Sequence, residues 1–235
     1  SGMLEFTDKP YRYYPPRPSR WVTRLMQCYN SSIYLPGRRH RIREVTVDHG
    51  EELNHARHLA GSRLLFLPNH PTHSDPLVMM EGLCQAGLTS RLMAAYDVFE
   101  RSALHAWVMQ RIGAFSVDRE GSDRQALKEA IGTLTEGREP LTIFPEGNVY
   151  LMNDRLTPFL DGPSYIAFKA QQQAGADQPV LAVPVSIKVT HLTNQRDTLR
   201  RLLCGLAEEI DADVDSHPVE GVYRVGLNLL SLKLR

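Results

Sequence analysis

The chain has 235 residues, 42% of them hydrophobic and 23% charged, and its formal net charge at pH 7 is zero. These proportions are ordinary for a globular protein with a sizeable core. The sequence excludes a membrane-spanning helix, because no run approaches the ~18 consecutive apolar residues that such a helix needs. Three scattered cysteines without a Cys-x-x-Cys pair argue against a disulfide framework and a structural zinc site, and no signal-peptide pattern begins the chain. We therefore expect a cytoplasmic protein.

Positive charge is concentrated in one segment near the N-terminus. Nine Lys or Arg residues and no acid lie between residues 9 and 43, whereas residues 44–235 carry 18 bases and 25 acids. Apolar residues recur at helical spacing within this segment: Trp21, Val22, Leu25, Met26 and Tyr29. A basic amphipathic helix with tryptophan at its apolar edge can lie in the interface of an anionic membrane. We therefore expect residues 9–43 to associate peripherally with a membrane.

The charge of this segment is also compatible with a solvated arm or with a nucleic-acid partner. A solvated basic arm would have the same composition, but it would not need the apolar residues at helical spacing. A nucleic-acid partner is not expected, because no recognised nucleic-acid-binding motif accompanies the charge.

Beyond this segment, apolar runs alternate with amphipathic stretches. The apolar runs predict strands over 64–67, 91–96, 114–117, 141–144 and 180–189. Helices are predicted from Asp75-Pro76, over 99–112, from a capping box at 122–125 to Gly137, and from Gly162-Pro163 toward Gly175. This alternation predicts an α/β fold with a mixed, largely parallel sheet flanked by helices. We expect a basic, amphipathic N-terminal segment (1–48), followed by a single α/β domain (49–235).

Three polar loops follow predicted strands, at His70, at Asp118-Arg119 and at Glu146-Gly147. Ligands of such sheets gather beyond the carboxyl ends of the strands, where these loops are expected to lie. The first loop has the spacing H-x-x-x-x-D, and Asp75 begins a helix, where its ionised form is favoured. If the intervening turn folds back, Asp75 accepts a hydrogen bond from one ring nitrogen of His70. The other ring nitrogen is then free to act as a base on a hydroxyl or amine of the substrate.

Four short blocks stand in order between about residues 62 and 189. They are Asn69-His-x-x-x-x-Asp75, Gly113-Ala-Phe-Ser-Val-Asp-Arg119, Ile143-Phe-Pro-Glu-Gly147 and Val183-Pro-Val185. In this order they resemble the four sequence blocks of the glycerolipid acyltransferase family, whose best-known members acylate lysophosphatidic acid. The basic segment and the residues beyond Val189 carry no motif of this family.

The resemblance implies a lipid-metabolic enzyme of phospholipid biosynthesis. Such an enzyme transfers a fatty acyl chain from an acyl thioester, either acyl-CoA or an acyl carrier protein, to a hydroxyl of a lipid or lysolipid acceptor. It uses no cofactor and no metal. His70 would take the hydroxyl proton, and Asp75 would orient and stabilise the imidazolium.

Contacts with substrate are also implied by the resemblance. The residues concerned are Asn69, Arg119, Glu146, Gly147 and Asn148. Arg119 would bind the phosphate of the acceptor, a task that suits the bidentate geometry of a guanidinium. Gly147 would let the backbone approach the substrate. Glu146 would position either the acceptor or its own loop, and the sequence leaves these two roles open.

The chain departs from the family at two phosphate-binding positions. Many members continue F-P-E-G with Thr-Arg, where this chain has Asn148-Val149, and a lysine that the family often carries near Ala95 is absent. Losing one charge-assisted contact removes roughly 1.5–3 kcal/mol of binding free energy. We therefore expect an activity like that of a 1-acylglycerol-3-phosphate O-acyltransferase, with the identity of the acceptor left open.

Two alternatives remain. His70, His73 and Asp75 are metal-ligand types and fit a metal-dependent hydrolase, although prolines occupy positions 71 and 76, where one zinc hydrolase family needs histidines. A non-catalytic lipid-binding protein on the same fold is the second alternative, because a fold alone does not establish activity.

Overall fold

The computed structural model describes residues 11–48, 50–61, 63–119, 121, 123–209 and 218–233. The chain divides into two compact units, with the boundary between Lys188 and Val189. The division expected from the sequence, at residue 48, stays a prediction. Within the first unit, the basic segment continues directly into the α/β fold.

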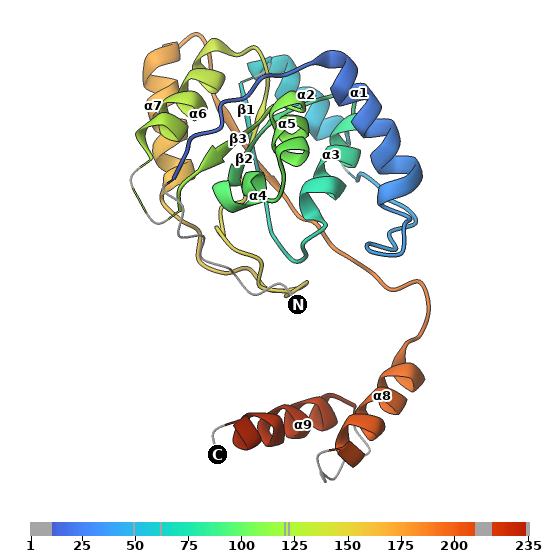
Figure 1. The fold of residues 1–235 in the computed structure, drawn as a ribbon. Coiled ribbons are helices and arrows are strands. Elements are labelled where there is room, and N and C mark those ends of the chain that lie inside the picture. The colour runs from blue at the N-terminus through green and yellow to red at the C-terminus, as the bar shows by residue number, and fades with distance from the viewer. Residues whose placement is uncertain are drawn as a thin grey trace. The chain divides into compact units, whose positions relative to one another are not determined.

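The described strands form one sheet in which every pair of neighbours is parallel (Figure 1). Their order is β3-β2-β4-β1-β5. The strands are β1 (Leu64–Pro68), β2 (Arg91–Ala95), β3 (Ala114–Val117), β4 (Leu141–Thr142) and β5 (Leu181–Val185). The predicted α/β class is thereby confirmed.

Helices cover both faces of this sheet. In the first unit they are α1 (Arg20–Tyr29), the π-helix η1 (Asn30–Tyr34), α2 (Gly50–Ala60), α3 (Asp75–Gln85), α4 (Tyr96–Glu100), α5 (Ala103–Arg111), α6 (Arg124–Glu136) and α7 (Gly162–Ala174). Helices α6 and α7 pack on one face, and α2, α3, α4 and α5 pack on the other (Figure 1). Among the described residues, no helix is long and apolar enough to cross a membrane.

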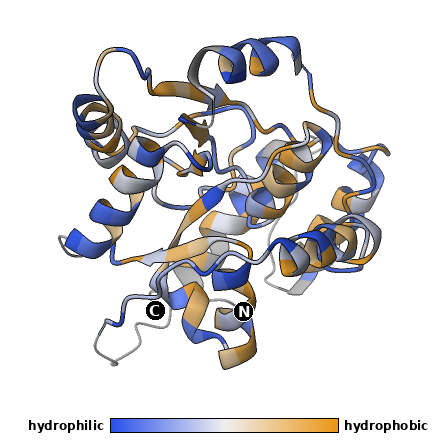
Figure 2. Cartoon of the chain, turned by 90° about the horizontal axis from the view of Figure 1, so that it is seen from above, coloured by the Kyte–Doolittle hydropathy of each residue, from blue (hydrophilic) through white to orange (hydrophobic). Residues whose placement is uncertain are grey.

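The alternation of side chains along each strand supplies both layers of the core. Leu65 packs against α6 and α7, whereas its neighbours Leu64 and Phe66 pack against α2 and α3. In Figure 2 the strands carry hydrophobic residues in orange, and the helices around them show both orange and blue. Burial on both faces explains why the strands appear in the sequence as apolar runs rather than as alternating patterns.

Several element boundaries differ from those predicted. The helix predicted over 99–112 is two helices, because α4 ends at Glu100 and Ser102 caps α5 by accepting a hydrogen bond from the amide of His105. The strands predicted over 141–144 and 180–189 are shorter, since β4 ends at Thr142 and β5 at Val185.

Glycine stands at two of the predicted helix ends. Gly137 closes α6 at a φ of 63°, a left-handed conformation that favours glycine, and Gly175 follows α7. The residue that caps α6 is Asp123, which accepts hydrogen bonds from the amides of two following residues. Ser122, the first residue of the predicted capping box, lies outside the described residues. Helix α3 begins at Asp75 as predicted, and Ser74 takes its N-cap position, which the Asp75-Pro76 pattern had assigned to Asp75.

The N-terminal segment is part of the packed unit. Residues 11–19 run beside the edge strand β3, where the Ser116 amide donates to the Tyr14 carbonyl at 3.1 Å and the Tyr14 amide donates to the Ser116 hydroxyl at 2.8 Å. The predicted helix follows as α1. Its apolar residues divide into a half-buried pair, Val22 and Met26, and an exposed set: Trp21, Leu25 and Tyr29.

The second unit is a pair of helices, α8 (Arg196–Glu209) and α9 (Pro218–Lys233). Leu203, Ala207 and Val225 form the buried cluster between them. No motif marks these residues, and neither helix was predicted from the sequence.

Candidate active site

The site is built where β1 and β4 end. The two strands pair in parallel, with Leu65 opposite Leu141 and Phe66 opposite Thr142. His70 and Glu146 each lie five positions beyond the first of these pairs. The register of two buried strands therefore sets both residues side by side at the carboxyl edge of the sheet, where the sequence predicted a site.

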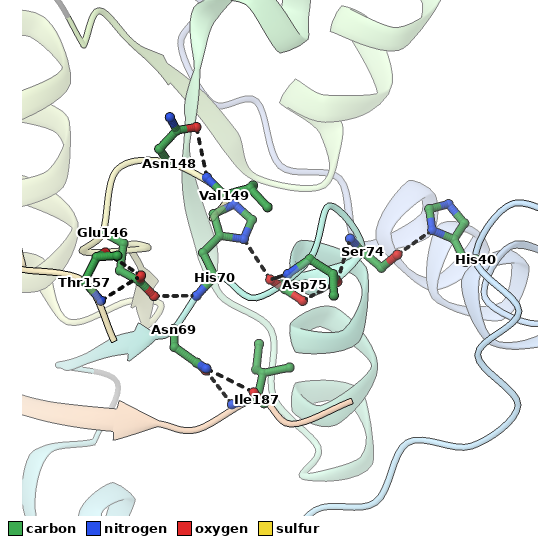
Figure 3. A network of polar contacts seen from close by, with 11 residues as sticks. His40, Asn69, His70, Ser74, Asp75, Glu146, Asn148, Val149, Thr157 and Ile187 are labelled. Carbon is green, nitrogen blue, oxygen red and sulfur yellow. Dashed lines mark hydrogen bonds and ion pairs between the residues drawn. The ribbon is translucent and has the colours of Figure 1, made fainter. Parts of the chain in front are cut away.

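The turn after His70 folds back as predicted, and Asp75 lies beside the imidazole (Figure 3). The distance between Nδ1 of His70 and Oδ2 of Asp75 is 2.8 Å. The Asp75 side chain has no exposed surface, and it accepts two further hydrogen bonds from Thr72, at 2.7 Å from the amide and 2.6 Å from the hydroxyl. A buried carboxylate needs such partners, and here they fix its orientation toward His70.

The geometry of His70 determines which ring nitrogen is available. Asp75 accepts at the Nδ1 side, so the proton is assigned to Nδ1 and Nε2 is left with its lone pair. The ring also packs against Phe144, with 4.3 Å between ring centroids. This contact and the hydrogen bond hold the imidazole in one orientation, and the side chain stays partly exposed. The arrangement can remove a proton from a group placed at Nε2.

Glu146 ties the histidine to a second loop. One carboxylate oxygen accepts the backbone amide of His70 at 2.8 Å, and the other accepts the amide of Thr157 at 3.2 Å together with the Thr157 hydroxyl. Burial acts to raise the pKa of Glu146, but the hydrogen bonds from Thr157 and His70 outweigh it and leave the pKa below its ordinary value. Of the two roles left open by the sequence, these contacts are those of a loop-positioning residue.

Arg119 and Gly147 meet at the edge of the site. The Arg119 guanidinium donates to the Gly147 carbonyl at 3.0 Å and lies 3.8 Å from the carboxylate of Asp97, with 38% of its side chain exposed. Gly147 adopts a φ of 68°, and a Cβ there would lie 2.6 Å from Cδ1 of Leu160. The glycine is therefore needed for the turn and for the close approach of Leu160.

The two asparagines predicted to contact substrate make backbone hydrogen bonds. The buried side-chain amide of Asn69 exchanges hydrogen bonds with the backbone of Ile187, at 3.0 and 2.6 Å, and so joins the end of β1 to the chain beyond β5. Asn148 accepts the amide of Val149 at 2.9 Å. The structure thus gives these asparagines local roles, and their contact with substrate stays a prediction.

Three residues of the site were not predicted from the sequence. Thr72 could have been found, because hydroxyl residues before a helix commonly bond nearby polar groups. Thr157 and His40 gave no such signal, since their partners are distant in sequence. Nδ1 of His40 lies 2.7 Å from the Ser74 hydroxyl, 34 positions away (Figure 3).

The residues of the metal-dependent alternative, His70, His73 and Asp75, are not arranged as a metal site. His73 is exposed, whereas Asp75 is buried against Thr72 and His70. In the part of the chain that the structure describes, no group of three or more His, Cys, Asp or Glu side chains is placed to hold a metal ion.

Comparison with known protein families gives a match over more than half of the chain. A family model described as Acyltransferase matches residues 44–188. The matched region contains His70, Asp75, Arg119 and Glu146, and it ends at the last residue of the first unit. No curated protein and no solved structure matches the chain.

Glu146→Gln should change how stability depends on pH. Because the folded-state pKa of Glu146 is lowered from 4.5, the ionised carboxylate stabilises the fold fully above pH 4.5. This contribution is lost as the pH falls through the lowered pKa. The free energy of unfolding of the wild type, measured with urea, should therefore approach that of Glu146→Gln at pH values below 4.5. Asp177→Asn, at an exposed turn position outside the helices, is the control for the loss of a carboxylate. A constant offset for Glu146→Gln would contradict the assigned role.

Proposed function

Because the chain belongs to the acyltransferase family, we propose that it transfers a fatty acyl chain from an acyl thioester to a hydroxyl of a glycerolipid-type acceptor. His70 is the general base of this reaction, and Asp75 is its partner. The observation that carries the proposal is the 2.8 Å contact between Nδ1 of His70 and the fully buried carboxylate of Asp75. The donor is acyl-CoA or an acyl carrier protein, both of which present the acyl group as a thioester.

The proposed reaction proceeds by addition and elimination at the thioester carbonyl. Nε2 of His70 takes the proton of the acceptor hydroxyl as its oxygen forms a bond to the carbonyl carbon. The tetrahedral intermediate then collapses, the carbon–sulfur bond breaks, and the thiolate recovers the proton from the imidazolium. Asp75 stabilises this imidazolium while it exists. A base of this kind contributes ~10²–10⁴-fold to the rate.

The contacts of Asp75 favour the base over the metal-dependent alternative. Both of its carboxylate oxygens accept hydrogen bonds, from Thr72 and from the imidazole of His70. A metal ion bound there would have to displace these bonds. His73, the third member of the alternative ligand set, is exposed.

Arg119 supplies the charge for an anionic acceptor. Its guanidinium reaches the third loop through the Gly147 carbonyl, and the contact with Asp97 is long enough to exchange for a phosphate. The two cations that the family often adds are missing here, because Val149 stands at one position and no lysine lies near Ala95. We therefore propose an acceptor that is anionic but held by fewer charges than lysophosphatidic acid is in the family.

Exposed apolar residues lie close to the site in sequence and are tied to it by Thr157. They follow Glu146 directly: Tyr150, Leu151, Leu156, Phe159 and Leu160. An acyl chain needs an apolar surface, and contact with it would remove these side chains from water. We propose that this loop receives the acyl chain of the donor or of the acceptor.

The first test concerns His70. His70→Ala should abolish acyl transfer while the variant stays folded, because Asp75 keeps its two hydrogen bonds from Thr72. Thiol release from an acyl thioester, with and without acceptor, measures the reaction. His73→Ala is the matched control, since His73 lies in the same turn but is exposed. Equal loss of activity in both variants, together with metal in the purified wild type, would support the hydrolase instead.

The second test concerns Arg119. Arg119→Ala should raise the KM for an anionic acceptor roughly 10- to 100-fold, because a charge-assisted hydrogen bond contributes about 1.5–3 kcal/mol. The KM for the thioester should change little. Arg138→Ala, which removes an arginine with 79% of its side chain exposed beyond the end of α6, is the control. A main effect of Arg119→Ala on thioester affinity would show that this loop belongs to the donor.

Helix α1 is the surface that we propose for membrane contact. Its outer side exposes 82% of Trp21 and 68% of Leu25, and Arg20 and Arg24 beside them are also exposed. An apolar edge with flanking guanidinium groups suits the interface of an anionic bilayer. The enzyme would then work while peripherally attached to the membrane that contains its acceptor.

The third test uses point substitutions in α1. The variant Trp21→Ala with Leu25→Ala should sediment less with anionic vesicles than the wild type does, and salt should weaken the wild-type binding, since exposed charges are screened within ~8 Å at physiological ionic strength. Activity on a soluble short-chain acceptor should be retained. Leu192→Ala, at a comparably exposed position outside α1, is the control. Unchanged sedimentation of the double variant would remove α1 as the anchor.

A further inference from the structure

Ser74 occupies the cap position of α3 without capping it. A serine at this position usually accepts a hydrogen bond from an amide of the first turn, but the Ser74 side chain makes no such bond. Its hydroxyl instead lies 2.7 Å from Nδ1 of His40 (Figure 3). The bond that would stabilise α3 locally is therefore replaced by a contact with a distant part of the chain.

His40 is held in place at some cost. It lies in the turn after η1, and its ring packs against Tyr34 with 4.7 Å between centroids. Its other nitrogen, Nε2, is buried and has no hydrogen-bond partner among the residues that the structure describes. Burial, with a smaller effect of Arg39, lowers the pKa of His40 and so favours its neutral form. A buried nitrogen without a partner is unfavourable, so the contacts with Ser74 and Tyr34 must hold the ring in this position.

The segment that contains His40, residues 30–40, makes hydrogen bonds to α3 at two more places. The buried side-chain amide of Asn30 donates to the Leu77 carbonyl at 3.0 Å, in the first turn of α3. One residue further on, the Ser31 hydroxyl donates to the carboxylate of Glu81. Residues 30–40 are thus hydrogen-bonded at three places to α3 and its cap residue Ser74.

A short chain of hydrogen bonds leads from Ser74 to the base. The Ser74 amide donates to the Thr72 hydroxyl at 3.1 Å, and this hydroxyl donates to Oδ1 of Asp75 at 2.6 Å. Oδ2 of the same carboxylate accepts from His70. Displacement of Ser74 would therefore disturb both the donor and the orientation of the carboxylate that holds His70.

We propose that His40 is a positioning residue of the active site. Through Ser74 it holds the turn Thr72–Asp75 in the conformation in which Asp75 orients His70, so that catalysis depends on the docked N-terminal segment. This inference rests on the proposed function, because it assumes that His70 is the base. His40 itself does not touch the substrate.

The experiment compares variants of the full chain in steady-state thioester turnover and in thermal unfolding. His40→Ala should lower kcat roughly 10- to 100-fold, as a small misplacement of a catalytic group does, and leave the KM for the thioester near that of the wild type. His40→Asn can place an amide nitrogen or oxygen near the position of Nδ1, and it should restore most of kcat. His55→Ala, which removes an exposed histidine of α2, is the control and should behave as the wild type.

A double variant tests the path through Ser74. Ser74→Ala should reproduce the loss of kcat, and Ser74→Ala combined with His40→Ala should lose no more than either variant alone, because both remove one interaction. Ser74→Ala removes a single hydroxyl, so it keeps the test valid if His40→Ala does not fold.

The remaining outcomes distinguish a failure of the inference about His40 from a failure of the proposed function. Unchanged kcat in His40→Ala, additive losses in the double variant, or a loss that follows the melting temperature and is not restored by His40→Asn would overturn the inference. A wild type that does not consume thioesters, or one whose turnover survives His70→Ala, would overturn the proposed function and the inference with it.

Discussion

The parallel pairing of β1 with β4 is the constraint on which the site depends. His70 and Glu146 are 76 positions apart in the chain, and the register of two buried strands brings them within one hydrogen bond of each other. Both strands are covered on both faces, so the register cannot slip without moving apolar side chains into the wrong layer. The hydrophobic core thereby fixes the position of a polar site that lies outside it.

The Glu146 carboxylate connects the loop after β1 to the loop after β4 by hydrogen bonds. A buried carboxylate is costly unless its oxygens accept hydrogen bonds, and here the donors come from His70 on one side and Thr157 on the other. The requirement to satisfy one charge therefore couples His70 to the loop that carries the exposed apolar residues 150–160. Gly147 extends the same coupling toward Arg119, whose guanidinium donates to its carbonyl.

The sequence predicted what depends on local patterns and missed what depends on distant contacts. His70 and Asp75 lie in one turn, so their contact could be expected on the condition that this turn folds back, and the apolar runs indicated all five strands. The contact of His40 with Ser74 joins separate loops, and the contact of Thr157 with Glu146 spans 11 positions within the long connection between β4 and α7. No periodicity or spacing in the sequence encodes either contact. The break between α4 and α5 was missed because the apolar pattern continues across Ser102, whereas the helical conformation of the backbone is interrupted there.

The N-terminal segment brings two proposed roles into one short stretch of structure. Helix α1 continues without interruption into η1, so the exposed stripe of Trp21 and Leu25 is followed closely by Asn30, which holds α3. A lipid surface can alter the active site only if it has different affinity for two arrangements of this segment. Because residues 30–40 contact α3 at three places, a membrane that favoured the docked arrangement would also favour the orientation of Asp75 toward His70. In that case the two proposed roles, membrane attachment and the positioning of His70, would be linked through residues 30–40.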